Sequence, residues 1–248
     1  MTPRSNRANL ENVTGQRYVE LPPPAHLRPY VRCFWASRNG PQVRTHLVFP
    51  DGCTDIIATD TTLHVAGPMT TTERVPLAPD AIVAGVRFLP GAASAALGVS
   101  VAELVDDNPA LSALWGRRAD DLLDRTALAT ARERLAALAD AITVTAPPDR
   151  IAVAAGNALT RRPDLPLSGM ARSLGISDRQ LRRRMEEAVG YSPRTLARIM
   201  RFQHFLVASE SSCDLAELAI TAGYSDQPHL TRECKAFTGL TPRALINR

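Results

Sequence analysis

The sequence predicts an α+β protein: a small antiparallel β barrel or sandwich with helices, then an all-α domain with two helix-turn-helix units joined by a long helix. Three observations support this prediction. Short β-like runs separated by proline and glycine occupy residues 17–100. Helical periodicity takes over from residue 101. Within the last hundred residues, one helix-turn-helix pattern occurs twice.

The β-like runs of the first part are bounded by turn-forming residues. They lie at Tyr30–Trp35, His46–Phe49, Thr54–Ala58, Leu63–Ala66 and Ala81–Phe88. We expect Asp51-Gly52, a dipeptide typical of tight hairpins, to form a hairpin turn before the next apolar strand. The stretch 66–71 predicts another turn, and the chain is expected to switch from strand to helix near Pro90-Gly91.

Residues 101–145 predict helices. The first is expected to be interrupted at Asn108-Pro109, with a second beginning at Pro109, and residues 119–142 predict one amphipathic helix. Its apolar stripe consists of Leu122, Leu128, Leu135 and Leu138. Such a stripe packs internally more often than it binds a partner, and dimerisation through residues 119–142 is the alternative hypothesis.

The first helix-turn-helix pattern lies between residues 167 and 201. Ala171 stands four residues before Gly175, which accepts positive φ without a Cβ clash in a tight turn. Ser177 and Gln180 have the spacing of a capping box at the start of the second helix. The outer side of that helix carries Arg179, Arg182, Arg183 and Arg184. This arrangement is typical of a helix that enters the major groove of DNA.

The second copy begins at residue 215. Ala219 again stands four residues before a glycine, Gly223, and the positions of Ile176, Ser177 and Leu181 are taken by Tyr224, Ser225 and Leu230. Near-identical phrases close the copies, GYSPRTL at 190–196 and GLTPRAL at 239–245. Residues 192–209 predict one long connecting helix, in which Pro193 is tolerated at the first turn.

These paired motifs, the connecting helix and the closing phrase resemble the C-terminal DNA-binding domain of AraC/XylS-type transcriptional regulators. The phrases FPDGCTDII (49–57), AGPMTT (66–71) and GVRFLPGAASAALGVS (85–100) resemble, more loosely, the cupin-like N-terminal domains of an AraC subgroup. The resemblance implies a sequence-specific transcription regulator, usually an activator, whose N-terminal domain binds a small-molecule effector, dimerises or does both. It implies double-stranded DNA, RNA polymerase, an effector and a second copy of the chain as partners.

The expected domain organisation follows from these patterns. It comprises a disordered lead-in (1–16), a β-rich effector or regulatory domain (17–100), a helical dimerisation or connector region (101–145), a proline-stiffened linker (146–150) and an AraC-type DNA-binding domain (149–248).

The resemblance assigns the residues that read DNA. Those expected to read bases are Arg179, Arg182 and Arg183 in the first unit and Gln227, His229 and Arg232 in the second. Those expected to contact phosphates or flank the interface are Ser177, Arg184, Arg194, Arg198, Thr231 and Lys235, and Arg243 is placed in the same way. For the arginines and the lysine, an intramolecular ion pair or a solvated surface charge is the alternative. Pro228 and Cys234 depart from the family pattern, which weakens the argument for readout by the second unit.

Charge and composition agree with this interpretation. The chain of 248 residues has a formal net charge of +4, and residues 149–248 contain fifteen Lys and Arg against ten Asp and Glu. Basicity is therefore concentrated in the repeat-bearing part. The four cysteines are scattered without a CxxC pair, and no apolar stretch has the length of a membrane span or a secretory signal. We expect a bacterial, cytoplasmic, nucleoid-associated protein.

Two other functions were weighed. A metal-dependent cupin-type enzyme needs clustered ligands, and the candidates are Cys33, His46, Asp51, Cys53, Asp55 and His64. The spacing that brings two histidines together on one strand is missing, so no metal, cofactor or catalytic residue is expected, although a thiol or metal sensor at Cys33 and Cys53 stays open. A non-specific DNA-compaction protein is disfavoured by the modest net charge.

Overall fold

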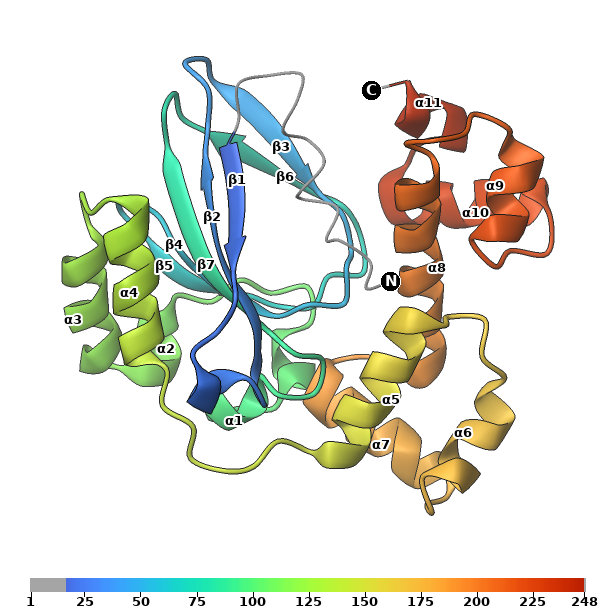
Figure 1. Ribbon diagram of the computed structural model, residues 1–248, viewed down its shortest axis with the longest axis horizontal. Helices are drawn as coiled ribbons and strands as arrows, with labels where there is room; N and C mark the ends of the chain where they lie inside the picture. The colour runs from blue at the N-terminus through green and yellow to red at the C-terminus, as the bar shows by residue number, and fades with distance from the viewer. Residues whose placement is uncertain (1–16, 248) are drawn as a thin grey trace.

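The computed structural model describes residues 17–247, so the predicted lead-in at 1–16 lies outside the described residues. It has a sheet-bearing N-terminal part and a helical C-terminal part, which lie side by side (Figure 1). This arrangement confirms the predicted α+β fold class. The connection between the parts, residues 142–149, forms no regular helix or strand.

The N-terminal part contains two antiparallel sheets. The larger has the strand order β1-β2-β7-β4-β5, and the smaller pairs β3 with β6. The strands are β1 (Arg17–Leu21), β2 (Val31–Arg38), β3 (Arg44–Val48), β4 (Asp55–Ala58), β5 (Leu63–Ala66), β6 (Glu73–Leu77) and β7 (Ile82–Phe88). Sequence analysis missed β1 and β6. β6 contains Pro76, which cannot donate to a ladder, and three of its five residues, Glu73, Arg74 and Pro76, are exposed, so the strand has no apolar run.

The predicted hairpin at Asp51-Gly52 is wrong. β3 pairs with β6, whereas β4 pairs with β5 and β7, so this turn carries the chain from one sheet to the other. Gly52 has a φ of +71° and packs against α8, where an added Cβ would lie 2.7 Å from Leu196 Cδ1. The glycine therefore serves a close approach between distant segments, which the local dipeptide pattern cannot distinguish from a hairpin.

Helices cover one face of the larger sheet (Figure 1). They are the 3₁₀ turns η1 (Ala25–Leu27) and η2 (Val101–Leu104) and the α-helices α1 (Ser94–Leu97), α2 (Leu111–Trp115), α3 (Arg117–Thr126) and α4 (Ala131–Ala141). The helix expected to run to Asn108 is thus only a 3₁₀ turn, and α2 begins two residues after Pro109. Alternate residues of β2, β4 and β7, such as Phe34, Ile56 and Val86, point into this core.

The single helix predicted over 119–142 is also wrong. It divides at Leu128, which has a φ of +54° and is 93% exposed, and Thr130 starts α4 with a capping box to Glu133. Leu135 and Leu138 are buried in the same core as the sheet, and α4 packs on β7 and β2. The apolar stripe is thus used within the chain, in agreement with the packing alternative, and Leu128 does not belong to it.

The C-terminal part is all helical. Its elements are α5 (Arg150–Arg161), α6 (Leu167–Ser173), α7 (Asp178–Val189), α8 (Pro193–Ala208), α9 (Leu215–Thr221), α10 (Gln227–Thr238) and α11 (Pro242–Ile246). The long helix predicted over 192–209 is confirmed as α8. Its residues Leu196, Ile199 and Phe202 are fully buried in one core that includes residues from α5 to α10. Both helix-turn-helix units therefore pack on the same rod.

Candidate nucleic-acid interface

The first unit consists of α6, a tight turn and α7. Gly175 has a φ of +71°, and the turn is closed by Ile176 N–H donating to the carbonyl of Ala171 at 3.1 Å. The predicted capping box is confirmed: Ser177 N–H donates to Gln180 Oε1 at 2.9 Å, and Gln180 N–H donates to Ser177 Oγ at 3.3 Å. Two otherwise unsatisfied amides at the start of α7 are thereby bonded.

The second unit repeats the turn with one difference. Gly223 has a φ of +83°, and Tyr224 N–H donates to the carbonyl of Ala219 at 2.8 Å. Its recognition helix, however, is capped by Asp226, which accepts from His229 N–H at 2.6 Å. The cap thus lies one residue later than Ser225, the position suggested by the sequence alignment of the copies. The second turn is one residue longer than the first.

The closing phrases have the same geometry in both copies. Gly190 and Gly239 end α7 and α10 in the left-handed conformation, and a hydroxyl then caps the next helix. Ser192 caps α8 and Thr241 caps α11, each followed by a proline at the first helical position. This repeated stop-and-start signal places α8 and α11 at equivalent exits from the two units.

The reading face predicted for α7 lies open. Arg179, Arg182 and Arg183 are all exposed although the N-terminal part is docked alongside. Arg182 Nε donates to Glu186 Oε1 at 2.8 Å, one helical turn away, which raises the pKa of the guanidinium. Arg184 points elsewhere: its NH1 lies 2.7 Å from Oδ2 of Asp149, the N-cap of α5. For Arg184 the structure therefore favours an intramolecular ion pair.

The corresponding face of α10 is less open. Gln227 and Arg232 are exposed, but His229 is half-buried, with Nδ1 at 3.2 Å from Ser225 Oγ and its ring packed edge-on against Tyr224. The hydroxyl of Thr231 donates to the carbonyl of Gln227 at 2.9 Å. Two of the polar side chains expected at the interface are thus engaged with their own helix start.

The flanking positions divide into two groups. Arg194, Lys235 and Arg243 are exposed, whereas Arg198 is held by Glu233 through two contacts of 2.9 and 3.1 Å. Cys234 lies on the buried side of α10. Burial raises the pKa of its thiol to about 12, so Cys234 serves as a small core residue.

The two parts of the molecule are joined by polar contacts that sequence analysis did not anticipate. Gln203 Nε2 in α8 donates to the carbonyl of Pro50 at 2.6 Å, and the hydroxyl of Tyr191 donates to the carbonyl of Met69 at 2.6 Å. Phe49 packs edge-on against Phe202, with ring centroids 5.8 Å apart. The β3–β4 and β5–β6 connections therefore contact α8 and the residues just before it.

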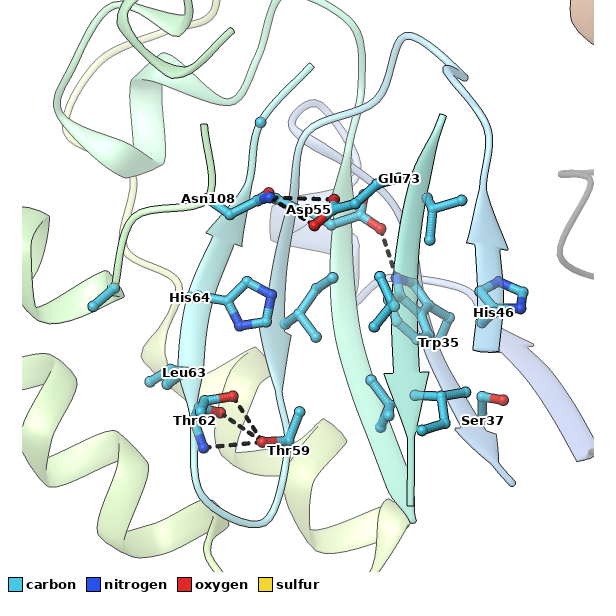
Figure 2. Close-up of a pocket in the computed structure, with 18 of the residues that line it drawn as sticks. Trp35, Ser37, His46, Asp55, Thr59, Thr62, Leu63, His64, Glu73 and Asn108 are labelled. Carbon is cyan, nitrogen blue, oxygen red and sulfur yellow. Dashed lines mark hydrogen bonds between the residues drawn. The ribbon is translucent and has the colours of Figure 1, made fainter. Parts of the chain in front are cut away.

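A cavity of about 710 Å³ lies in the N-terminal part, walled by residues of both sheets (Figure 2). This volume is typical of small-molecule sites. Trp35, His64 and Asp55 come from the larger sheet and Glu73 and His46 from the smaller one. From the sequence, the histidines were candidate metal ligands or ordinary structural residues, and no cavity was predicted. The signal that could have indicated the cavity is the set of polar residues, such as Ser37 and His64, that alternate along the strands with the buried core residues.

Asp55 forms the most deeply buried polar contact of this wall. It accepts two hydrogen bonds from Arg87, of 3.1 and 3.0 Å, and one from Trp35 Nε1 at 3.0 Å. Arg87 is fully buried, and its NH2 also lies 3.5 Å from Asp51 Oδ2. The two acids raise the pKa of Arg87 against the opposing effect of burial. This network fixes the charges behind the cavity wall.

The candidate metal and thiol residues show a different chemistry. Among residues 17–247, no three His, Cys, Asp or Glu side chains come together as a metal site. Burial raises the pKa of Cys33 and of Cys53 to about 12, so both thiols are protonated at neutral pH. Within the same range, no helix is both long and apolar enough to cross a membrane.

Two family models match the chain. A helix-turn-helix domain model matches residues 170–248, and a domain of unknown function (DUF6597) matches residues 19–109. No curated protein matches the sequence.

Solved structures with a similar chain course include chains of two proteins, one of them a response regulator. The C-terminal domain of AraT, a response regulator from Geobacillus stearothermophilus, is 21% identical with a TM-score of 0.38, covering 40% of this chain and 85% of that one. ToxT from Vibrio cholerae is 9% identical with a TM-score of 0.43, covering 83% of this chain and 97% of that one. ToxT bound to an unsaturated fatty acid is also 9% identical, with a TM-score of 0.42 and coverages of 83% and 94%. All of these similarities are distant.

Proposed function

We propose that this chain, which belongs to the AraC-type helix-turn-helix DNA-binding regulators, reads two adjacent major-groove segments of one operator and is controlled through its N-terminal cavity. The observation that carries the first part is the pair of units on one rigid helix. α7 and α10 both pack on α8 through a common core, and each presents an exposed arginine at the same helical position, Arg183 and Arg232. Arg183 lies two residues after the buried Leu181, and Arg232 lies two residues after the buried Leu230.

The rigid connector gives the operator its expected form. Because α8 holds both units in one core, the protein selects DNA whose two recognised segments lie about one helical turn, roughly 34 Å, apart. A site that does not present both grooves at this spacing must bend, at a cost that depends on its sequence. We propose that Arg179, Arg182 and Arg183 read one segment, and that Gln227 and Arg232, with His229 at the edge, read the other.

Selection of bound DNA from a random pool tests this proposal. The full chain is expected to enrich a site with two conserved blocks about one turn apart, and footprinting is expected to protect both. Arg183→Ala is expected to lose preference in one block only, whereas Arg117→Ala, at an exposed arginine of α3, is a matched control that leaves selection intact. Enrichment of no sequence, or protection of a single block, would contradict the proposal.

Control through the cavity is supported by the position of its rim. Asp51 and Met69 line the cavity and lie in the two connections that grip the C-terminal part. The neighbour of Asp51, Pro50, accepts the hydrogen bond from Gln203 of α8, and Met69 accepts the bond from Tyr191. A ligand that favours one position of these connections therefore biases the position of the rod that carries both reading helices.

Two glycine substitutions test this coupling. Gly52→Ala places a methyl group 2.7 Å from Leu196 and 3.1 Å from Met200, whereas Gly98→Ala has the same backbone strain, at a φ of +78° against +71°, but nothing within 4 Å. Gly52→Ala is expected to weaken binding to the selected site several-fold, and Gly98→Ala to leave it unchanged. Binding constants would be measured on folded, full-length proteins. Equal effects of the two substitutions would contradict coupling through this contact.

The resemblance to AraC/XylS-type regulators supports activation of transcription through contact with RNA polymerase as the mode of action. A transcription assay with purified polymerase and the selected site is expected to show more transcript when the protein is added. A fall in transcript would indicate repression instead.

The domain division at 149–150 is part of the same proposal, since Asp149 caps the first helix of the DNA-binding part.

A further inference from the structure

Among residues 17–247, the charged side chains that line the cavity of the N-terminal part are acidic. Four acidic side chains line it, namely Asp51, Asp55, Glu73 and Asp120, whereas none of the described residues lining it is Lys or Arg. The buried guanidinium of Arg87 lies behind the wall and is shared between Asp51 and Asp55. Glu73 and Asp120 lie outside this network, so the described residues that line the cavity carry more acidic than basic side chains.

Glu73 is the acid best placed to meet a ligand. It is the first residue of β6, its side chain is exposed, and Figure 2 shows it at one end of the cavity beside Asn108. Its two carboxylate oxygens accept from Asn108 Nδ2 at 3.4 and 3.2 Å. The amide of Asn108 is an uncharged donor, so it orients the carboxylate of Glu73 and leaves it able to accept hydrogen bonds from a cationic group.

The ring of His64 faces the same space (Figure 2). Burial lowers the pKa of the imidazole, and the nearby charge of Glu73 opposes this only in part. The ring is therefore neutral at neutral pH and offers one nitrogen as a hydrogen-bond acceptor. A second acceptor thus lies within the electrostatic reach of Glu73.

The rest of the wall is largely apolar. Ile57, Val75, Leu77 and Leu123 line it together with the rings of Tyr18 and Trp35, which stack with centroids 6.1 Å apart. Such a wall favours the burial of a hydrocarbon or aromatic body. A carboxylate ligand would gain the same apolar contacts but would meet the carboxylate of Glu73 at the polar end.

We propose that the cavity binds a small organic amine, whose protonated nitrogen donates hydrogen bonds to the carboxylate of Glu73 and to a ring nitrogen of His64. The apolar body of the amine lies against Ile57, Val75 and the Trp35 side of the wall. The inference rests on the proposed control function and names the chemical class of its effector. It also predicts the charge of the preferred ligand: the site selects for positive charge and against carboxylates of equal size.

A matched series of probes tests this selection. Tryptamine, tryptophol and indole-3-acetate share one aromatic body and differ in carrying an amine, a hydroxyl or a carboxylate, and hexylamine, hexanol and hexanoate repeat the comparison with an alkyl body. Calorimetric titration of the full chain is expected to show binding in the order amine, alcohol, carboxylate in each series, with at least tenfold between the ends. Carboxylates binding as tightly as amines, or no binding by either amine up to millimolar concentration, would overturn the proposal.

Three variants locate the site. Glu73→Gln is expected to abolish the preference for amines over alcohols, because it removes the charge and keeps the shape. Glu103→Gln removes an exposed carboxylate of η2 that does not line the cavity, and is expected to keep the preference. Val75→Trp fills the cavity and is expected to remove binding of amines and alcohols together. Preserved amine preference in Glu73→Gln would overturn the assignment.

DNA binding in the same samples separates this inference from the proposed function. If the amines do not bind but the chain still selects a two-block site, the ligand class is wrong and DNA readout stands. If alcohols or carboxylates bind and change DNA affinity, control through the cavity stands and only the sign of the charge is wrong. If the chain selects no DNA sequence, the proposed function itself fails.

Discussion

The two helix-turn-helix units share their turn but differ in the side chains that they present to solvent. In both, an alanine carbonyl and a left-handed glycine close the turn, and a buried leucine anchors the second helix. The first recognition helix then exposes three arginines, whereas the second begins with Gln227 and Pro228 and keeps His229 half-buried. The backbone framework is thus repeated while the chemistry of the reading face has diverged.

A second difference lies one turn beyond the anchoring leucine. Arg184 and Glu233 occupy the same position in α7 and α10, and each pairs with the helix that precedes its unit. Arg184 binds Asp149 at the start of α5, and Glu233 binds Arg198 in α8. The acidic and basic partners are exchanged between the two units, but the ion pair lies at the same position of the second helix. We infer that this position orients the second helix of each unit, whichever sign its charge carries.

The largest expected effect concerns what the units share. Leu181→Ala and Leu230→Ala each remove a side chain that is at most 2% exposed within one common core. Each is expected to lower the free energy of unfolding by about 2–5 kcal/mol, as truncation of buried leucines does. Denaturant titration of the full chain measures this change. A loss below about 1 kcal/mol for only one of them would show that the units are packed unequally.

The next effect concerns the reading faces. Arg183→Ala is expected to cost ~1–3 kcal/mol on the selected site and to relax the preference at one base pair of its block. Arg232→Ala is expected to act on the other block, and the two costs should add because the sites are separate. Binding titrations with single-base variants of the site provide the measurement. If Arg183→Ala leaves site selection untouched, the assignment of this residue to base reading is wrong.

The orienting ion pairs are expected to contribute less. Arg184→Met and Glu233→Gln each break a partly exposed pair, which is typically worth about 1 kcal/mol or less. Burial acts to raise the pKa of Asp149, but hydrogen bonds from Ala152 N–H and Arg184 outweigh it and hold the pKa below its usual value. The stabilisation by Asp149 is therefore present above the unfolded-state pKa, about 3.9, and is lost as the pH falls through the folded value.

Unfolding measurements at neutral and acidic pH check this sign. The stability gap between the wild type and Arg184→Met is expected at neutral pH, should begin to narrow below about pH 4, and should close as the pH falls through the lowered pKa of Asp149 in the folded state. A gap that widens on acidification would show that the pair with Asp149 does not stabilise α7.

The smallest effect distinguishes two arginines of α8. Arg194 is exposed, whereas Arg198 is engaged by Glu233. Arg194→Ala is expected to weaken binding to all DNA sequences alike and to reduce the slope of log K against log salt by about one. Arg198→Ala is expected to leave the slope unchanged, since its charge is already paired. Equal slopes for both variants and the wild type would show that Arg194 does not contact a phosphate.

Local signals in the sequence predicted the helical part well. The Ser177–Gln180 capping box, the glycine turns and the Ser192-Pro193 start act over three or four residues, so the pattern and the structure agree there. The N-terminal part was harder because its strands pair across long separations. Asp51-Gly52 has the composition of a hairpin, but its neighbours are decided by β6 and α8, which are far away in the chain.

Short-range sequence patterns were enough to predict the two copies of the unit, the rod between them and the arginine-rich outer face of α7, since each depends on local spacing and on glycine, proline and hydroxyl chemistry. The packing of distant segments was needed to show that Arg184 and Arg198 are paired within the chain, that His229 is half-buried, and that carboxylates from two sheets line one cavity. These facts depend on which distant side chains meet when the strands and helices pack. Packing satisfies charge and volume across the whole fold, and neighbouring residues in the sequence do not encode it.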